Sequence, residues 1–286
     1  MAADGRRRVR ATSAGDMRRD DSPRALLTAL AFRLAMLSPA LHGVRGSCAR
    51  VAATQATRLC AASSLATPTH RAVLVDAGGC LIEPAEPVPD TYVRFATAHG
   101  VRGLSPAAVK AGFRTAFAAP RPAGALRYEG DGAAFWRGVV AAATGCADAA
   151  LFDALFHFYA KPEAWRVAPG APAALRRLRA AGVRLAVVSN WDTRLRPLLH
   201  DLQLSPLFDA VVVSAELGAE KPDARVFAAA LSALGADLQP HEALMVGDDE
   251  GNDVAGAKAH GCDALLFGKD VSTFAELAAL VLRDAP

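Results

Sequence analysis

The chain has 286 residues, of which 52% are hydrophobic, and a formal net charge of +3 at pH 7. This length and apolar content suffice for one large or two smaller domains with a sizeable core. The modest charge, part of which lies in an arginine-rich N-terminus, does not indicate nucleic-acid binding. The longest apolar stretch, residues 25–37, is too short to span a bilayer and contains Arg33, so we expect no membrane insertion.

The five cysteines are widely spaced and include no CxxC pair. An odd number of such cysteines suits free thiols in a reducing compartment. We therefore expect neither a disulfide framework nor a zinc site.

The N-terminal region differs in composition from the rest of the chain. Residues 22–75 contain no Asp or Glu, whereas Arg recurs among Ala, Leu, Ser and Thr. This composition is typical of organelle transit peptides, so we expect residues 1–70 to be a disordered, transit-peptide-like extension. It favours a mitochondrion slightly over a chloroplast. The alternative is a biased, disordered tail without a targeting function, which would leave the protein in the cytoplasm.

From residue 72 onward, short β-branched runs alternate with helical stretches, which is typical of a parallel α/β sheet. One such helix is expected to begin at Pro222 and to end at Gly235. The short connections fit βαβ units and predict an α/β core made of residues 71–83 and 166–286. The predicted strands are residues 72–76, 183–189, 210–214, 243–248 and 264–267.

Residues 84–165 interrupt this alternation because they contain no convincing strand. Their pattern indicates about four helices, with residues 118–130 as a Pro- and Gly-rich loop between two halves. The sequence therefore predicts a helical domain inserted after the first strand. The expected helix starts are Asp90, Ser105, Asp131 and Asp148.

Three predicted strands end in a polar residue: Asp76, Ser189 and Asp248. Each alone could belong to a turn or a helix cap. In parallel α/β sheets, however, ligands bind outside the carboxyl ends of the strands. Asp76 would then be a nucleophile that attacks an anionic electrophile. Ser189 and Lys221 would neutralise charge on the transferred group.

The segment GDDEGND, residues 247–253, concentrates carboxylates after a predicted strand. Asp248, with Asp249 and Asp253, could hold a hard cation, because magnesium typically takes one or two carboxylates together with substrate oxygens and water. An EF-hand is a poor match, since its spacing of acidic residues is absent. The alternative is a solvated acidic loop in which Asp253 caps a helix.

These segments, in this order, resemble the haloacid dehalogenase superfamily of hydrolases over about residues 72–285. The first motif of that family, D-x-D-G-T-L, is similar to DAGGCL here, and its second motif, a strand ending in Ser or Thr, is similar to LAVVSN. Its third motif is similar to EKPD and its fourth, GDxxxxD, to GDDEGND. The segment SNWDTRL and the length of the insertion resemble the branch called haloacid dehalogenase-like hydrolase domain-containing protein 3.

The resemblance implies a Rossmann-like core, a mobile helical cap formed by residues 84–165, and Asp76 as the nucleophile. It also implies that Ser189 and Lys221 contact a phosphate or carboxylate group. The implied cofactor is Mg²⁺, with ligands from Asp76, the Gly78 carbonyl and Asp248, supported by Asp253.

Residues within or directly after the first two motifs are expected to contact the substrate. Asp192, which follows the last of these residues, is expected to cap a helix. The expected substrate-binding residues are Gly79, Cys80, Asn190 and Trp191.

Two positions depart from the phosphatase pattern. Gly78 stands where phosphatases carry a second Asp, which protonates the leaving alkoxide and then activates water; losing such a group typically costs about 10²- to 10⁴-fold in rate. Cys80 stands where Thr is usual and is a poorer hydrogen-bond donor. Members of the family without the second Asp include dehalogenases, which expel a halide without a proton, and phosphonatase-like enzymes, which keep magnesium.

The leading interpretation is a magnesium-dependent hydrolase of this family that acts on a small phosphorylated or otherwise anionic metabolite, with weak or narrow phosphatase activity. Two alternatives stay open. The first is a catalytically silent binding or scaffold protein with the same fold, and the second is a metal-independent, dehalogenase-like hydrolase.

Overall fold

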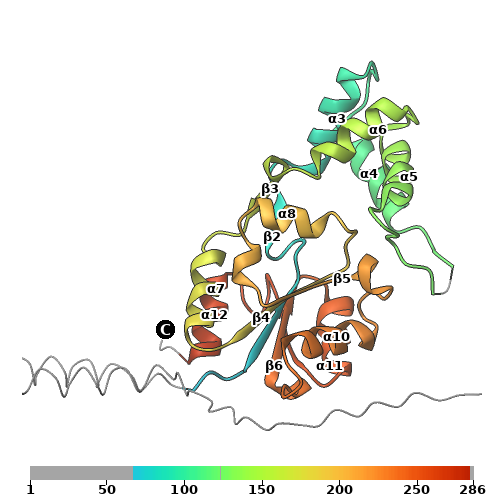
Figure 1. Cartoon of the computed structure of the whole chain (residues 1–286). Helices are drawn as coiled ribbons and strands as arrows, with labels where there is room; N and C mark the ends of the chain where they lie inside the picture. The colour runs from blue at the N-terminus through green and yellow to red at the C-terminus, as the bar shows by residue number, and fades with distance from the viewer. Residues whose placement is uncertain (1–66, 123, 284–286) are drawn as a thin grey trace, which may run out of the picture. The chain divides into compact units, whose positions relative to one another are not determined.

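The computed structural model describes residues 67–122 and 124–283. Its central sheet has five parallel strands in the order β5-β4-β1-β6-β7. Every bound of the five predicted strands is confirmed to within one residue, and the predicted α/β class is confirmed (Figure 1). The strands are β1 (Ala72–Val75), β4 (Arg184–Ser189), β5 (Ala210–Val213), β6 (Ala243–Gly247) and β7 (Asp263–Leu266). The predicted transit-peptide-like extension lies outside the described residues as far as residue 66.

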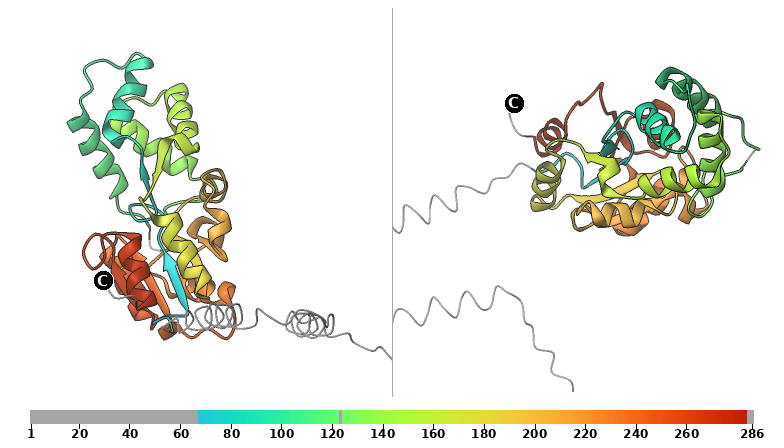
Figure 2. Two further views of the ribbon diagram at one scale, coloured as in Figure 1. Left: turned by 90° about the vertical axis from the view of Figure 1, so that its left-hand side faces the viewer. Right: turned by 90° about the horizontal axis from the view of Figure 1, so that it is seen from above.

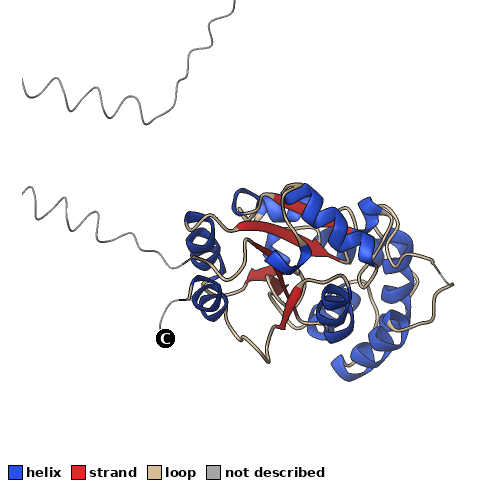
Figure 3. Ribbon diagram, turned by 90° about the horizontal axis from the view of Figure 1, so that it is seen from below, coloured by secondary structure: helices blue, strands red, loops and turns tan. Residues whose placement is uncertain are grey.

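Helices cover both faces of this sheet (Figure 3). Successive strand residues point to opposite faces, so Val73 and Val75 pack against α7 and α12, whereas Leu74 packs against α10. Two hydrophobic layers thus hold the sheet between them. The helices of this part are α7 (Ala171–Ala180), α8 (Leu195–Asp201), α9 (Ser214–Leu217), α10 (Ala224–Leu234), α11 (Gly256–Ala259) and α12 (Phe274–Leu282), with 3₁₀ turns η1 (Pro162–Ala164), η2 (Ser205–Leu207) and η3 (Pro240–Glu242) and the π-helix η4 (Glu250–Ala255).

The helix predicted to begin at Pro222 begins two residues later, at Ala224. Its N-cap is Asp223, whose side chain accepts a hydrogen bond from the Arg225 N–H. Such a bond satisfies a backbone donor that the first helical turn leaves unpaired. The Lys221–Pro222 peptide bond is cis, and Gly235 ends the helix as predicted.

The insertion forms four helices with a hydrophobic core of their own (Figure 1). Ser105 and Asp148 are N-caps as predicted, whereas Asp90 lies inside the first turn of its helix and Asp131 precedes the N-cap Gly132. In the described ranges no single helix is long and apolar enough to cross a membrane; α5 and α6 reach that length and composition only as a pair bent by 112°. The four helices are α3 (Val88–Ala98), α4 (Pro106–Phe117), α5 (Ala133–Thr144) and α6 (Ala149–Phe158).

Two short strands that were not predicted flank this helical cap. β2 (Ile82–Pro84) and β3 (Trp165–Val167) pair in an antiparallel ribbon (Figure 2). The expectation of no strand in residues 84–165 is therefore wrong at its two ends. Three residues are too few for an alternating pattern to be recognised. The ribbon ties together the two points at which the chain enters and leaves the cap.

We predict that Leu277→Ala lowers the free energy of unfolding by about 2–5 kcal/mol, because Leu277 on α12 is fully buried and its removal leaves a cavity. Leu280→Ala, on the same helix but 43% exposed, should change it by no more than about 0.5 kcal/mol. Urea denaturation measures both. Equal effects would contradict the packing of α12 on the sheet.

Candidate active site at the carboxyl edge of the sheet

The three strands with polar ends are neighbours in the sheet. β1 lies between β4 and β6, so Asp76, Ser189 and Asp248 meet at one edge, as the sequence predicts. The strands that follow β1 in the chain lie on both sides of it in the sheet, first β4 and β5 and then β6 and β7. Such a reversal of strand order leaves a crevice at the carboxyl end of β1. Asp76 and Ser189 are buried, whereas Asp248 is exposed.

Lys221 is the centre of the polar contacts at this edge. Its Nζ lies 2.7 Å from Asp76 Oδ1, 2.5 Å from Asp253 Oδ1 and 2.8 Å from the Val188 carbonyl oxygen. Burial alone would lower the pKa of Lys221, but the two carboxylates outweigh that effect and hold the pKa above its ordinary value. An ammonium group has three donors, and here all three are used by the protein. Lys221 is therefore a fixed positive charge beside Asp76.

Asn190 holds the backbone of Lys221 in place. The Asn190 Nδ2 donates to the Lys221 carbonyl at 2.9 Å, and its Oδ1 accepts from the Lys221 N–H at 2.7 Å. Both ends of its amide thus bind the protein, and Asn190 positions the lysine. Its expected contact with a substrate stays a prediction.

The acidic segment after β6 turns one carboxylate inward. Asp253 is 1% exposed, and its Oδ2 accepts from the Asp249 N–H at 3.0 Å. Burial raises the pKa of Asp253, and the Lys221 ammonium opposes that rise. The helix cap is Asp249, whose side chain accepts from the N–H groups of Gly251 and Asn252. The alternative in which Asp253 caps a helix is therefore wrong.

The carboxylates of Asp76, Asp248 and Asp253 could hold a metal ion, since one oxygen from each lies within 4.8 Å of the others. Gly79 makes room for this group: it has a φ of +73°, and a Cβ there would collide with the Asp248 carboxylate. Loss of hydration in this crowded loop, and then the charge of Asp76, raise the pKa of Asp248, although its side chain stays open to solvent. Oxygen donors of this kind suit Mg²⁺.

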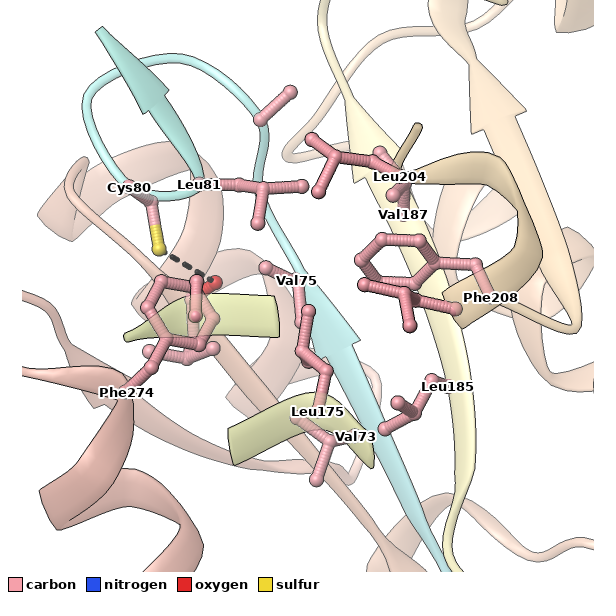
Figure 4. Packing of buried hydrophobic residues seen from close by; sticks show 14 of the residues in the cluster. Val73, Val75, Cys80, Leu81, Leu175, Leu185, Val187, Leu204, Phe208 and Phe274 are labelled. Atoms are coloured by element: carbon pink, nitrogen blue, oxygen red, sulfur yellow. Dashed lines mark hydrogen bonds between the residues drawn. The ribbon is translucent and has the colours of Figure 1, made fainter. Parts of the chain in front are cut away.

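Cys80 does not face the site, which corrects its expected role in substrate binding. Its side chain is 3% exposed and lies in the hydrophobic core near Phe274, with Sγ 3.9 Å from the Val246 carbonyl oxygen (Figure 4). Burial, and then the nearby charge of Asp76, hold the pKa of the thiol far above its ordinary value. Cys80 therefore contributes packing, not a reactive thiolate.

Trp191 occupies the space next to Gly78. A Cβ atom at position 78 would lie 3.1 Å from Trp191 Cζ3, which is closer than ordinary carbon contacts. The Trp191 N–H donates to Ser214 Oγ at 3.0 Å, and its ring packs on Trp165 with 5.1 Å between centroids. Trp191 thus fills the space next to position 78, where phosphatases carry the second Asp.

A cavity of about 400 Å³ opens above these residues. Its floor carries Asp76, Ser189 and Lys221, and its wall is formed mainly by aromatic side chains of the cap, among them Phe117 and Trp136. Gly78, Gly79, Asn190 and Trp191 also line it. The structure thus brings together every predicted site residue except Cys80. A direct substrate contact by Gly79 or Trp191 stays a prediction.

Two groups of residues, which the sequence did not single out for function, connect the cap to this site. Asp192 is fully buried and accepts from Trp136 Nε1 at 3.0 Å and from Arg194 Nη2 at 2.8 Å. Arg194 in turn donates to the Phe156 carbonyl at 3.0 Å. Asp192 also accepts from the Arg194 N–H, but α8 begins only at Leu195, so its predicted capping role is corrected.

Glu220, immediately before Lys221, makes a second connection. Its carboxylate accepts from Arg121 Nη2 at 2.6 Å and from the Arg127 N–H at 3.0 Å. Arg121 and Arg127 belong to the predicted loop 118–130 between α4 and α5. No local pattern marks such pairs, because the partners lie about 90 to 100 residues apart.

We predict that iodoacetamide near pH 8, where an ordinary thiol is partly ionised, labels Cys146 in the folded protein but spares Cys80 and Cys262. Cys146 is half-buried, whereas burial covers the other two and raises the pKa of Cys262 to about 11. Mass spectrometry of the digested protein, with and without denaturant, measures each cysteine. Labelling of Cys80 as fast as Cys146 would contradict its placement.

Comparison with known proteins identifies a family for the chain. The family model for haloacid dehalogenase-like hydrolases matches residues 70–261. The chain is 34% identical over 201 residues to human haloacid dehalogenase-like hydrolase domain-containing protein 3, an alignment that covers 67% of this chain and 79% of that protein. It is 38% identical over 119 residues to ribulose-1,5-bisphosphate 5-phosphatase of Halopiger xanaduensis, which covers 41% and 48%.

Among solved structures, the putative HAD-hydrolase YfnB of Bacillus subtilis, bound to magnesium, superposes with a TM-score of 0.56. That alignment covers 74% of this chain and 98% of YfnB at 16% identity, so it shows the fold alone. The family model spans about two thirds of the chain, and the human relative exceeds 30% identity over most of its own length. The chain belongs to the haloacid dehalogenase-like hydrolase family.

Proposed function

We propose that the protein is a magnesium-dependent hydrolase that uses Asp76 as a nucleophile on a small phosphorylated metabolite. The observation that carries this proposal is the position of Asp76, whose Oδ1 is held 2.7 Å from the buried ammonium of Lys221 at the floor of the cavity. In the described part of the chain no hydrogen bond is made to its other oxygen, Oδ2. A carboxylate held at one oxygen presents the other to an electrophile.

In the proposed reaction, Asp76 Oδ2 attacks phosphorus while the bond from phosphorus to the leaving-group oxygen breaks. Water then attacks the phosphorus of the aspartyl phosphate, releases inorganic phosphate and regenerates the carboxylate. The Ser189 hydroxyl, at the end of β4, would donate a hydrogen bond to a phosphoryl oxygen. Lys221 would act through its charge, because its three donors already bind protein acceptors.

Asp76 and Asp248 are the proposed direct ligands of the magnesium ion, together with the Gly78 carbonyl. Asp253 would support these ligands without binding the ion directly, since its two oxygens already accept hydrogen bonds from Lys221 and the Asp249 N–H. The bound ion would neutralise charge on the phosphoryl group. The relatives named as phosphatases support a phosphoryl substrate.

The second candidate is a silent member of the family that binds a ligand without turning it over. The observation that favours it is the contact between Gly78 and Trp191, which leaves no room for the usual acid without a shift of the ring. The two candidates differ in whether Asp76 reacts.

We predict that a screen of phosphorylated metabolites with Mg²⁺ finds turnover, and that Asp76→Asn lowers kcat by about 10³-fold or more. Asp201→Asn, which changes an exposed carboxylate beside His200, is the matched control and should leave kcat unchanged. Chelation of Mg²⁺ should abolish turnover. No substrate in the screen, or an Asp76→Asn variant as active as wild type, would contradict the hydrolase; turnover that survives chelation would favour the metal-independent alternative.

Gly78→Asp should raise turnover of an alkyl phosphate by about 10- to 100-fold, because it supplies the missing proton donor, with the gain limited by the shift it imposes on Trp191. Gly78→Ala adds the same Cβ without a carboxyl group and serves as the control. Steady-state release of phosphate measures both. If the wild-type protein shows no turnover and Gly78→Asp creates it, the silent candidate is supported. If Gly78→Ala raises turnover as much as Gly78→Asp does, the carboxyl group is not the cause of the increase.

A further inference from the structure

From the cavity walls and the Gly78–Trp191 contact we infer that the site selects aryl phosphates, in which a phenolic oxygen carries the phosphoryl group. This inference rests on the proposed function and names its substrate class. Two independent features carry it: the lack of a proton donor for the leaving group, and the aromatic lining of the cavity.

The first feature is that each titratable group around the described cavity is committed elsewhere or is a poor acid. No histidine lines it. Three of its carboxylates form the acidic group proposed to hold the metal, and the fourth, Asp249, accepts from the Gly251 and Asn252 N–H groups and from Asn252 Nδ2. Lys221 spends its three donors on Asp76, Asp253 and the Val188 carbonyl. Arg194 is held by Asp192.

The phenols of the cap do not replace the missing acid. Burial raises the pKa of Tyr128 and of Tyr159 to about 12, and burial also raises that of Tyr92. Arg127 lies with its guanidinium 4.1 Å from the centre of the Phe117 ring, and an arginine keeps its proton. Among the described residues that line the cavity, none is placed as a free carboxylic-acid or imidazole donor, so a leaving group that is stable as an anion is favoured.

This preference separates two kinds of ester. The conjugate acid of a phenolate has a pKa of about 10, whereas that of an alkoxide lies near the value of about 16 for water. A phenolate therefore leaves with the electron pair of its bond to phosphorus and takes a proton from solvent afterwards. An alkoxide needs the proton during bond breaking.

The second feature is the wall itself. Trp136 stacks on Tyr128 with centroids 5.8 Å apart and an interplanar angle of 19°, and it contacts Phe117 at 6.2 Å. Trp191 and Trp165 extend this surface down to the floor. Flat rings stack on such surfaces, and the polar side chains of this wall, those of Arg127, Arg194 and three tyrosines, lie among the rings. A cavity of about 400 Å³ lies in the usual range for small ligands.

Four compounds test the two features separately, with Mg²⁺ present. Phenyl phosphate and 2-phenylethyl phosphate both carry a ring but differ in the leaving group, and kcat/KM should favour phenyl phosphate by about 10²-fold or more. Phenylphosphonate and methylphosphonate cannot be cleaved at oxygen and differ in the ring, so their inhibition constants measure ring binding. Phenylphosphonate should inhibit at least about 10-fold more tightly.

Two matched variants locate the ring. Phe117→Leu removes a wall residue and should weaken inhibition by phenylphosphonate more than by methylphosphonate. Phe95→Leu, which alters a cap ring packed on Phe158 at 5.2 Å, should change neither constant.

The outcomes separate the inference from the proposed function. Turnover of 2-phenylethyl phosphate as fast as phenyl phosphate, or equal inhibition by the two phosphonates, would overturn the inference and leave an Asp76-dependent hydrolase intact. Turnover of neither ester, nor of any phosphorylated metabolite, would overturn both.

Discussion

The site depends on one buried ion group: the Lys221 ammonium between the carboxylates of Asp76 and Asp253. All three residues are less than 10% exposed, so each charge would be costly to bury without the others. Removing one member of such a group typically costs about 3–5 kcal/mol. This constraint explains why Asn190 fixes the Lys221 backbone, and why the π-helix η4 turns Asp253 inward.

The same group would orient the proposed reaction. Lys221 holds one oxygen of Asp76 and leaves the other without a hydrogen bond in the described part of the chain. Two connections link this group to the cap, because Glu220 directly precedes Lys221 and Asp192 follows Asn190 after one residue. A movement of the cap would therefore displace Lys221 through Glu220, and Ser189 through the loop that contains Asp192.

Much of this architecture was predictable because it depends on local patterns. The five strands are short apolar runs, and the polar residues at or just after the ends of β1, β4 and β6 are visible in the sequence. Parallel order alone places Asp76, Ser189 and Asp248 at one edge. The role of Cys80 was mistaken because spacing does not show where a side chain points: the turn after Asp76 directs Cys80 into the core. The positioning role of Asn190 was missed because its partner Lys221 lies 31 positions away. The Gly78–Trp191 contact, the ribbon β2–β3 and the cap connections arise from tertiary packing over long sequence distances.

The most direct test of the account is whether Asp76 itself becomes phosphorylated. The protein can be mixed with phenyl phosphate and Mg²⁺, quenched in acid, digested and mapped by mass spectrometry. The account predicts a phosphoryl group on Asp76 that is absent without substrate. Release of phenol and phosphate with no phosphoryl group on Asp76, or with one on another residue, would contradict it.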